Sequence, residues 1–104
     1  MEITSVKYIS ASPYMSKAQI QKSMNVSART VSNRLAEIDE YVQKGRYGNY
    51  TILDGCGVTY VNYLAFVDFL RYRKDLKAGR KVPQFNPTAV ARQIGWGNLQ
   101  AEYQ

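Results

Sequence analysis

The chain has 104 residues, a length that favours one domain with a single modest core. Hydrophobic residues make up 45% and aromatic residues 12% of the sequence, and this composition argues against an intrinsically disordered chain. Fourteen Lys and Arg residues against eight Asp and Glu give a net charge of +6 at pH 7, which favours a polyanionic partner, nucleic acid before an acidic membrane surface.

The first predicted helix follows a stretch of mixed strand and turn signals over residues 1–15. Ser16 is a natural N-cap, and Gln19 three residues later completes a capping box, so the segment KAQIQKSM is expected to be helical. Asn25 tolerates the left-handed conformation that ends a helix. Val26 is expected to be buried in the turn that follows.

A second helix is predicted from about residue 28 to residue 43, with Ser27 as its N-cap. Its apolar residues recur with the helical period and are expected to face the core: Val31, Leu35, Ile38 and Val42. The opposite side carries Arg29, Asn33, Ala36 and Glu40, flanked by Thr30 and Ser32. This helix therefore has one face for packing and another whose polar groups gather at its N-terminal end.

A β-hairpin is predicted next, with strands at Tyr50–Leu53 and Val58–Val61 joined by an Asp-Gly-Cys-Gly turn. Asn62 is expected to cap a long helix over about residues 63–78, which ends at Gly79. Its inward-facing residues are expected to be Tyr63, Phe66, Val67, Phe69 and Leu70. Asn86 and Pro87 are the N-cap and first residue of a short helix through about Ile94, and Trp96 is expected to dock on the core.

Several residue types that support common enzyme chemistry are missing. The sequence has no His, its one Cys cannot form a zinc site, and no Gly-rich segment has the spacing of a phosphate-binding loop. The acidic residues Glu37, Asp39 and Glu40 are interpreted as a solvated helix face rather than a cation site. We therefore expect a protein that is not an enzyme and that holds no cofactor and no metal.

The sequence also carries signals about the compartment. A single cysteine, Cys56, fits a reducing compartment. The first ten residues lack the basic segment and apolar core of a signal peptide. The most apolar window, VTYVNYLAFVDFL, is interrupted by Asn62 and Asp68 and is too short to span a bilayer. We expect a cytoplasmic protein with no membrane partner.

The segment KAQIQKSMNVSARTVSNRL, residues 17–35, resembles a helix-turn-helix, and the predicted hairpin directly after it resembles the wing of a winged helix. The resemblance implies a mainly α fold with a small β-hairpin, a winged helix-turn-helix occupying residues 1–104 as a single DNA-binding domain. Its expected parts are the helix-turn-helix at 16–43, the wing hairpin at 46–61, the long helix at 62–79, and the C-terminal helix and tail at 86–104. In so short and basic a chain, this combination is similar to small transcriptional regulators and excisionases of bacteriophages and mobile elements.

The resemblance further implies that double-stranded DNA is the partner and that the second helix enters the major groove by its N-terminal end. The expected base-reading residues are Arg29, Thr30, Ser32 and Asn33. The expected backbone contacts are Lys17, Lys22, Ser27 and Arg34. The expected wing contacts are Arg46, Tyr47, Asn49 and Tyr50, and Arg73 with Lys74 form an expected secondary basic patch.

Alternatives remain open on the sequence alone. A repressor would be expected to form a homodimer on a palindrome, whereas an excisionase-like architectural factor would assemble on repeated half-sites and bend the DNA. The two helices could also form a hairpin used only for packing. A protein-interaction module, such as an anti-repressor or adaptor that grips another phage or host protein, is the main competing function. RNA binding is less favoured, because no sheet with paired aromatic residues is predicted.

Overall fold

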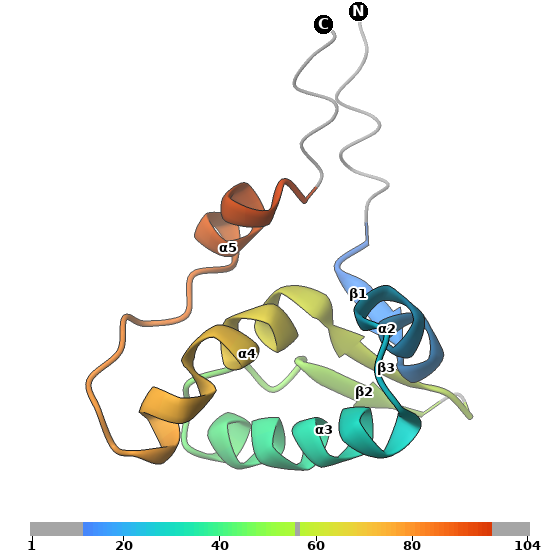
Figure 1. Ribbon diagram of the computed structural model, residues 1–104, viewed down its shortest axis with the longest axis horizontal. Helices are drawn as coiled ribbons and strands as arrows, with labels where there is room; N and C mark the ends of the chain where they lie inside the picture. The colour runs from blue at the N-terminus through green and yellow to red at the C-terminus, as the bar shows by residue number, and fades with distance from the viewer. Residues whose placement is uncertain (1–11, 56, 97–104) are drawn as a thin grey trace, which may run out of the picture.

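The computed structural model describes residues 12–55 and 57–96, and this part of the chain folds into helices around a small antiparallel sheet (Figure 1). The elements in chain order are β1 (Tyr14–Ser16), α2 (Lys17–Met24), α3 (Ala28–Gln43), β2 (Ile52–Asp54), β3 (Thr59–Asn62), α4 (Tyr63–Lys77) and α5 (Pro87–Ile94). The predicted mainly α class is therefore confirmed. None of the described helices is long and apolar enough to cross a membrane.

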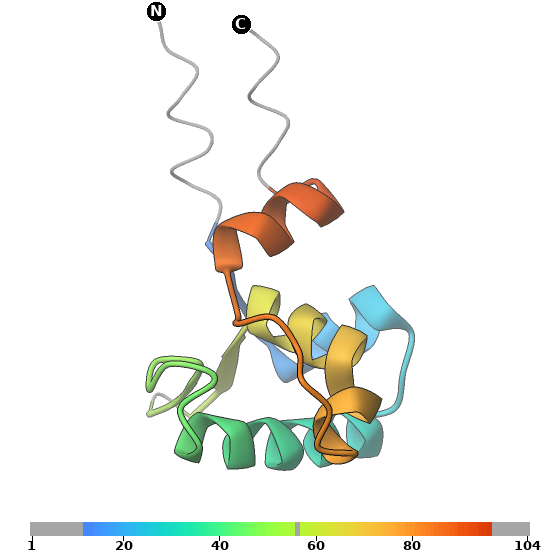
Figure 2. The same cartoon turned by 90° about the vertical axis from the view of Figure 1, so that its left-hand side faces the viewer.

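The helices form layers on either side of α4. In both views α3 lies on one side of α4, and α5 lies on the other side, at the end of an extended connector (Figures 1 and 2). The short helix α2 packs near the beginning of α3, to which it is joined by a three-residue turn. As a result, α3 has one side against the core and the opposite side at the surface of the molecule.

The local signals that delimit α2 and α3 are confirmed. The Ser16 hydroxyl accepts a hydrogen bond from the Gln19 amide at 3.2 Å, and the Gln19 side chain accepts one from the Ser16 amide at 2.8 Å. Asn25 adopts the left-handed conformation, with φ 56° and ψ 51°. Ser27 caps α3 by accepting from the Thr30 amide at 3.1 Å. The prediction that Val26 is buried is wrong, because this residue is 36% exposed.

The core lies between α2, α3, α4 and the sheet. Its buried members are Ile20, Val31, Leu35, Ile38, Tyr47, Val61, Ala65, Phe66 and Phe69. Three of the four predicted stripe residues of α3 are buried, and Val42 packs at the edge of the core. The expectation that Leu70 packs inward is wrong. The inner face of α4 runs through Ala65 and Phe69, and Leu70 is turned about 100° beyond Phe69, toward solvent.

The sheet has the strand order β1-β3-β2, and all its pairs are antiparallel. The predicted hairpin is present, with bounds shifted by one or two residues. Strand β1, which was not predicted as part of a sheet, pairs Met15 with Val61 on β3. Across the hairpin, Ile52 pairs with Val61 on the core side and Leu53 pairs with Tyr60 on the outer side. The third strand thus anchors the hairpin to the segment that leads into α2.

Candidate nucleic-acid interface

The outer face of α3 is the surface that the sequence predicted. Arg29, Asn33, Ala36 and Glu40 are all exposed, as is Ser32, while the buried stripe faces the opposite way. Within residues 12–55 and 57–96, the side chains of Arg29, Ser32 and Asn33 make no hydrogen bond or ion pair. Arg29 and Asn33 are one turn apart, so their Cβ atoms are neighbours on one side of the helix. Their donors and acceptors are directed to solvent.

Ser27 and Thr30, two further predicted contact residues, form hydrogen bonds that cap the N-terminus of α3. The Ser27 hydroxyl donates to Thr30 Oγ1 at 3.0 Å and accepts from the Thr30 amide. Thr30 is half-buried, so it is less accessible than Arg29 or Asn33. Lys17 is half-buried at the beginning of α2, whereas Lys22 on the same helix is exposed. Lys22 is therefore the better placed of these two lysines for contact with a phosphate.

The structure brings together two basic residues that the sequence assigned to separate roles. Glu37 on α3 accepts from Arg34 Nη1 at 2.8 Å and from both Nε and Nη2 of Arg73 on α4 at 2.9 Å. Lys77 also pairs with Glu37. The Arg73 guanidinium, against the opposing effect of burial and with help from Lys77 and Arg34, holds the pKa of Glu37 well below its usual range.

These contacts correct two expectations. Glu37 is not part of a solvated acidic face, because it is only 17% exposed and joins α3 to α4. Arg73 does not form a free basic patch with Lys74, since it is committed to Glu37, while Lys74 is exposed. Asp39 and Glu40 remain exposed, as predicted. Arg34 and Arg73 keep about a quarter of their side-chain surface accessible, so their charge still contributes to the field at that side of α3.

The predicted wing contacts from Arg46 and Tyr47 are wrong. Tyr47 is 2% exposed, and its hydroxyl donates to Asp68 Oδ2 at 2.6 Å. Arg46 donates to the same oxygen at 2.9 Å and to the carbonyl oxygen of Pro83 at 2.8 Å. Burial, followed by the hydrogen bond to Asp68, raises the pKa of Tyr47 well above its usual value. Both side chains are thus fixed inside the molecule.

The other two predicted wing residues remain at the surface. Asn49 is exposed and Tyr50 is 77% exposed. Both belong to the loop between α3 and β2, at the end of the hairpin away from its turn. The strand ends next to that turn lie at the same end of the molecule as the beginning of α3 (Figure 1).

Sequence reasoning missed the apolar outer face of the hairpin. Leu53 on β2 and Tyr60 on β3 are opposite one another and exposed, and Val58 just before β3 is exposed as well. The signal was present in the strand period of two: once Val61 is placed in the core, Tyr60 must point outward, and its partner Leu53 with it. This hairpin patch, Leu53, Val58 and Tyr60, is the second surface that could take part in binding.

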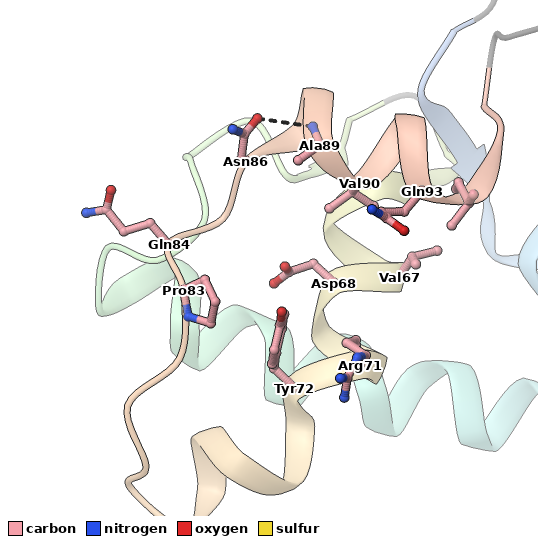
Figure 3. Close-up of a pocket in the computed structure, with 11 residues that line it drawn as sticks. Val67, Asp68, Arg71, Tyr72, Pro83, Gln84, Asn86, Ala89, Val90 and Gln93 are labelled. Atoms are coloured by element: carbon pink, nitrogen blue, oxygen red, sulfur yellow. Dashed lines mark hydrogen bonds between the residues drawn. The ribbon is translucent and has the colours of Figure 1, made fainter.

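A groove of about 640 Å³ lies between α4, α5 and the connector that joins them (Figure 3). The hydrogen bond from the Ala89 amide to Asn86 Oδ1 at 3.2 Å fixes the beginning of α5 beside it. Beyond the end of α5, the ring of Trp96 lies 5.4 Å from that of Tyr63, so Trp96 docks at the start of α4. Among the described residues, no three His, Cys, Asp or Glu side chains are grouped so that they could hold a metal ion.

The chain matches no protein-family model, and neither a curated protein nor a solved structure shows significant similarity to it. The functional argument therefore depends on the geometry of the molecule.

Proposed function

We propose that the protein binds double-stranded DNA in a sequence-specific manner through the N-terminal half of α3. The observation that carries this proposal is the exposed set Arg29, Ser32 and Asn33, whose side chains have no partner in the described part of the chain. An α-helix that presents such groups fits the major groove, where base edges carry a distinct pattern of donors and acceptors.

The arrangement around α3 supports the proposal. The tight α2–α3 turn at Asn25 resembles that of a helix-turn-helix, and the antiparallel hairpin after α3 follows the element order of a winged helix. The net charge of +6 favours a phosphate-rich partner. The acidic residues Asp39 and Glu40 lie in the second half of α3, which leaves the first half as the end suited to approach DNA.

The chemistry of the two leading residues differs. Arg29 carries a guanidinium that can donate two parallel hydrogen bonds to guanine, and Asn33 carries an amide that can pair with adenine. The free amide groups and dipole at the start of α3 favour a nearby phosphate, and Lys22 on α2 is an exposed cation for the backbone. In this proposal the protein is a small phage or mobile-element transcriptional regulator or an excisionase-like architectural factor.

The test is fluorescence anisotropy with a pool of short random duplexes at two salt concentrations, with sequencing of the bound fraction. The variant is Arg29→Ala with Asn33→Ala. The matched control is Thr88→Ala with Arg92→Ala, which changes one arginine and one polar residue at the same spacing on the exposed part of α5. Circular dichroism establishes that both variants stay folded.

We expect salt-sensitive binding by the wild type, an enriched sequence motif, and a loss of about tenfold or more in affinity for the α3 variant only. Equal losses of DNA affinity in the two double variants would mean that α3 contributes only through its positive charge. If both double variants bound DNA with the wild-type affinity, α3 would be excluded as the element that contacts the bases.

A second candidate function is protein interaction through the hairpin patch. Leu53, Val58 and Tyr60 form an exposed apolar cluster, and such clusters often mark contacts with other proteins. A contact of this kind should hardly respond to salt, whereas phosphate contacts weaken steeply as salt rises. Leu53→Ser with Tyr60→Ser would abolish it and leave the reading of bases by α3 in place.

A further inference from the structure

The groove between α4 and α5 has the size of a small-molecule site. Its volume of about 640 Å³ falls within the range of roughly 300–1,000 Å³ that is typical of ligand pockets. Both helices and the connector contribute to its walls, so the groove is formed by three consecutive segments of the chain, within residues 67–94 (Figure 3).

A buried carboxylate lies in the middle of this groove. Asp68 is 4% exposed, and Figure 3 shows its side chain directed into the space between α4, α5 and the connector. The hydrogen bonds from Tyr47 and Arg46 both end on Oδ2. Within residues 12–55 and 57–96, no group donates to Oδ1. A buried acceptor without a donor is costly, so a ligand that supplies one gains free energy there.

The charges around Asp68 decide what kind of donor fits. The ion pair with Arg46 at 2.9 Å already balances the carboxylate. A cationic ligand would therefore meet the repulsion of Arg46 and of Arg71, which also lines the groove. A neutral hydroxyl or amide donor meets no such repulsion.

Arg71 indicates which chemical group a ligand would carry at its other end. It lies three residues after Asp68 on α4, hence on the same side of the helix and about 5–6 Å away between Cβ atoms. Unlike Arg46, it is exposed and makes no hydrogen bond or ion pair with any described residue. Its guanidinium suits a carboxylate, which it can bind with two hydrogen bonds.

The remaining walls combine apolar and aromatic side chains with the amides of Gln84, Asn86 and Gln93. Val67 and Tyr72 contribute from α4, and Val90 and Ile94 contribute from α5. Ile94 is one of the few large apolar side chains of the described chain that stay exposed. A flat apolar body between the two helices would cover these groups, and removing such surface from water favours binding.

We propose that this groove binds a small aromatic or otherwise apolar carboxylate that carries a neutral hydroxyl or amide donor at its other end. The donor bonds Asp68 Oδ1, the body lies between Val67 and Val90, and the carboxylate pairs with Arg71. The groove is lined by α4 and α5, and α5 lies on the side of α4 away from α3 (Figures 1 and 2), so a bound ligand leaves the outer face of α3 accessible. This site does not depend on the proposed DNA binding.

The test uses the full chain and three probes in amide chemical-shift titrations. The probe 4-hydroxyphenylacetate has both polar ends, 4-methoxyphenylacetate lacks the donor, and 4-methylphenol lacks the carboxylate. We expect 4-hydroxyphenylacetate to saturate with a Kd of about 1 mM, a value ordinary for a ligand of this size, and to shift amides of α4 and α5. Each of the other probes should bind at least about fivefold more weakly.

Two variants locate the binding. Ala89→Phe places a ring in the groove and should abolish saturable binding, whereas Thr88→Phe, on an exposed part of α5 that does not line the groove, should leave Kd unchanged. Arg71→Gln should weaken 4-hydroxyphenylacetate about fivefold and leave 4-methylphenol unaffected. The spectra themselves report whether each variant is folded.

Three results would overturn the proposal. The first is no saturable shift with any probe up to about 20 mM, far above the expected Kd. The second is the same Kd for the hydroxy and methoxy probes, which would remove the role of Asp68. The third is a folded Ala89→Phe variant that binds as well as Thr88→Phe, which would place the ligand elsewhere.

Discussion

The hydroxyl of Tyr47 donates a 2.6 Å hydrogen bond to the carboxylate of Asp68, and this bond joins the loop after α3 to the middle of α4. Both residues are almost completely buried. Arg46 binds the same carboxylate and also the carbonyl oxygen of Pro83 in the connector. Three segments, the α3–β2 loop, α4 and the connector, are therefore joined through the ion pair of Arg46 with Asp68.

Tyr47→Phe should lower the free energy of unfolding by about 1–3 kcal/mol, because it removes one of the two donors to a buried carboxylate while the ring remains. Tyr60→Phe is the matched control: this tyrosine is exposed, and the change should stay within about 0.5 kcal/mol. Urea unfolding measures both values. Equal stabilities of the two variants would mean that the Tyr47 hydroxyl is dispensable.

Asp68→Ala should cost more than Tyr47→Phe, about 3–5 kcal/mol, because it leaves the guanidinium of Arg46 largely buried without its anion. The double variant Asp68→Ala with Arg46→Met should recover part of that loss, since it removes the unpaired charge and keeps an apolar chain of similar length. A double-mutant cycle in urea measures the recovery. A double variant less stable than Asp68→Ala would contradict this account of the pair.

The ion pairs of Glu37 with Arg34, Arg73 and Lys77 predict that the free energy of unfolding depends on pH in the acid range. The pKa of Glu37 is lowered in the folded protein from its ordinary value of 4.5, so the unfolded chain binds a proton first as the pH falls. The stabilisation is thus complete above about pH 5 and is lost progressively below pH 4.5. At neutral pH, Glu37→Gln should be destabilised by about 1–3 kcal/mol relative to wild type, and this difference should shrink between about pH 4.5 and pH 2.

Thermal unfolding of wild type and Glu37→Gln at a series of pH values measures the difference. Glu40→Gln is the control, because Glu40 lies on the same helix with an exposed side chain. Its stability should follow that of wild type over the whole range. A wild-type to Glu37→Gln difference that is constant down to pH 2 would show that the ion pairs with Arg34, Arg73 and Lys77 contribute nothing.

Asn25 gives a prediction about the α2–α3 turn. Its left-handed backbone is strained for residues with a Cβ atom, and Asn tolerates it better than most. Asn25→Gly should leave stability unchanged or raise it slightly, whereas Asn25→Ala should lower it by about 1 kcal/mol. Chemical unfolding of the three proteins measures the order. If alanine were as stable as glycine here, the backbone conformation would not limit this turn.

The features that could be predicted from the sequence are those encoded within a few neighbouring residues. The caps at Ser16, Ser27, Asn62 and Asn86 each depend on an amide two or three residues away, and all four are present. The stripe of α3 follows from helix geometry alone. For the same reason, the exposed face with Arg29 and Asn33 can be predicted without any tertiary contact.

The features that were missed depend on partners distant in the sequence. The position of Arg46 beside the predicted hairpin indicates a wing contact, but its side chain is bound inside the molecule by Asp68, 22 residues later. The acidic run that contains Glu37 is typical of a solvated helix face, and its actual partner Arg73 is 36 residues away. Strand β1 spans only three residues, and its pairing partner lies beyond two helices. No local pattern specifies these contacts.

The proposed DNA binding makes a final prediction that separates phosphate contacts from base contacts. Lys22→Ala should weaken binding to all sequences alike and reduce the slope of log K against log salt by about 1, because one fewer counterion is released. Asn33→Ala should leave that slope unchanged and relax the preference at one base pair, at a cost of about 1–3 kcal/mol on the preferred sequence. Lys81→Ala, which removes an exposed cation in the connector, is the control and should change neither quantity.

Salt titrations on the enriched duplex and on a version altered at one base pair measure both effects. If Lys22→Ala and Lys81→Ala had the same slope, α2 would not lie against the DNA backbone, and the orientation proposed for α3 in the groove would have to be abandoned.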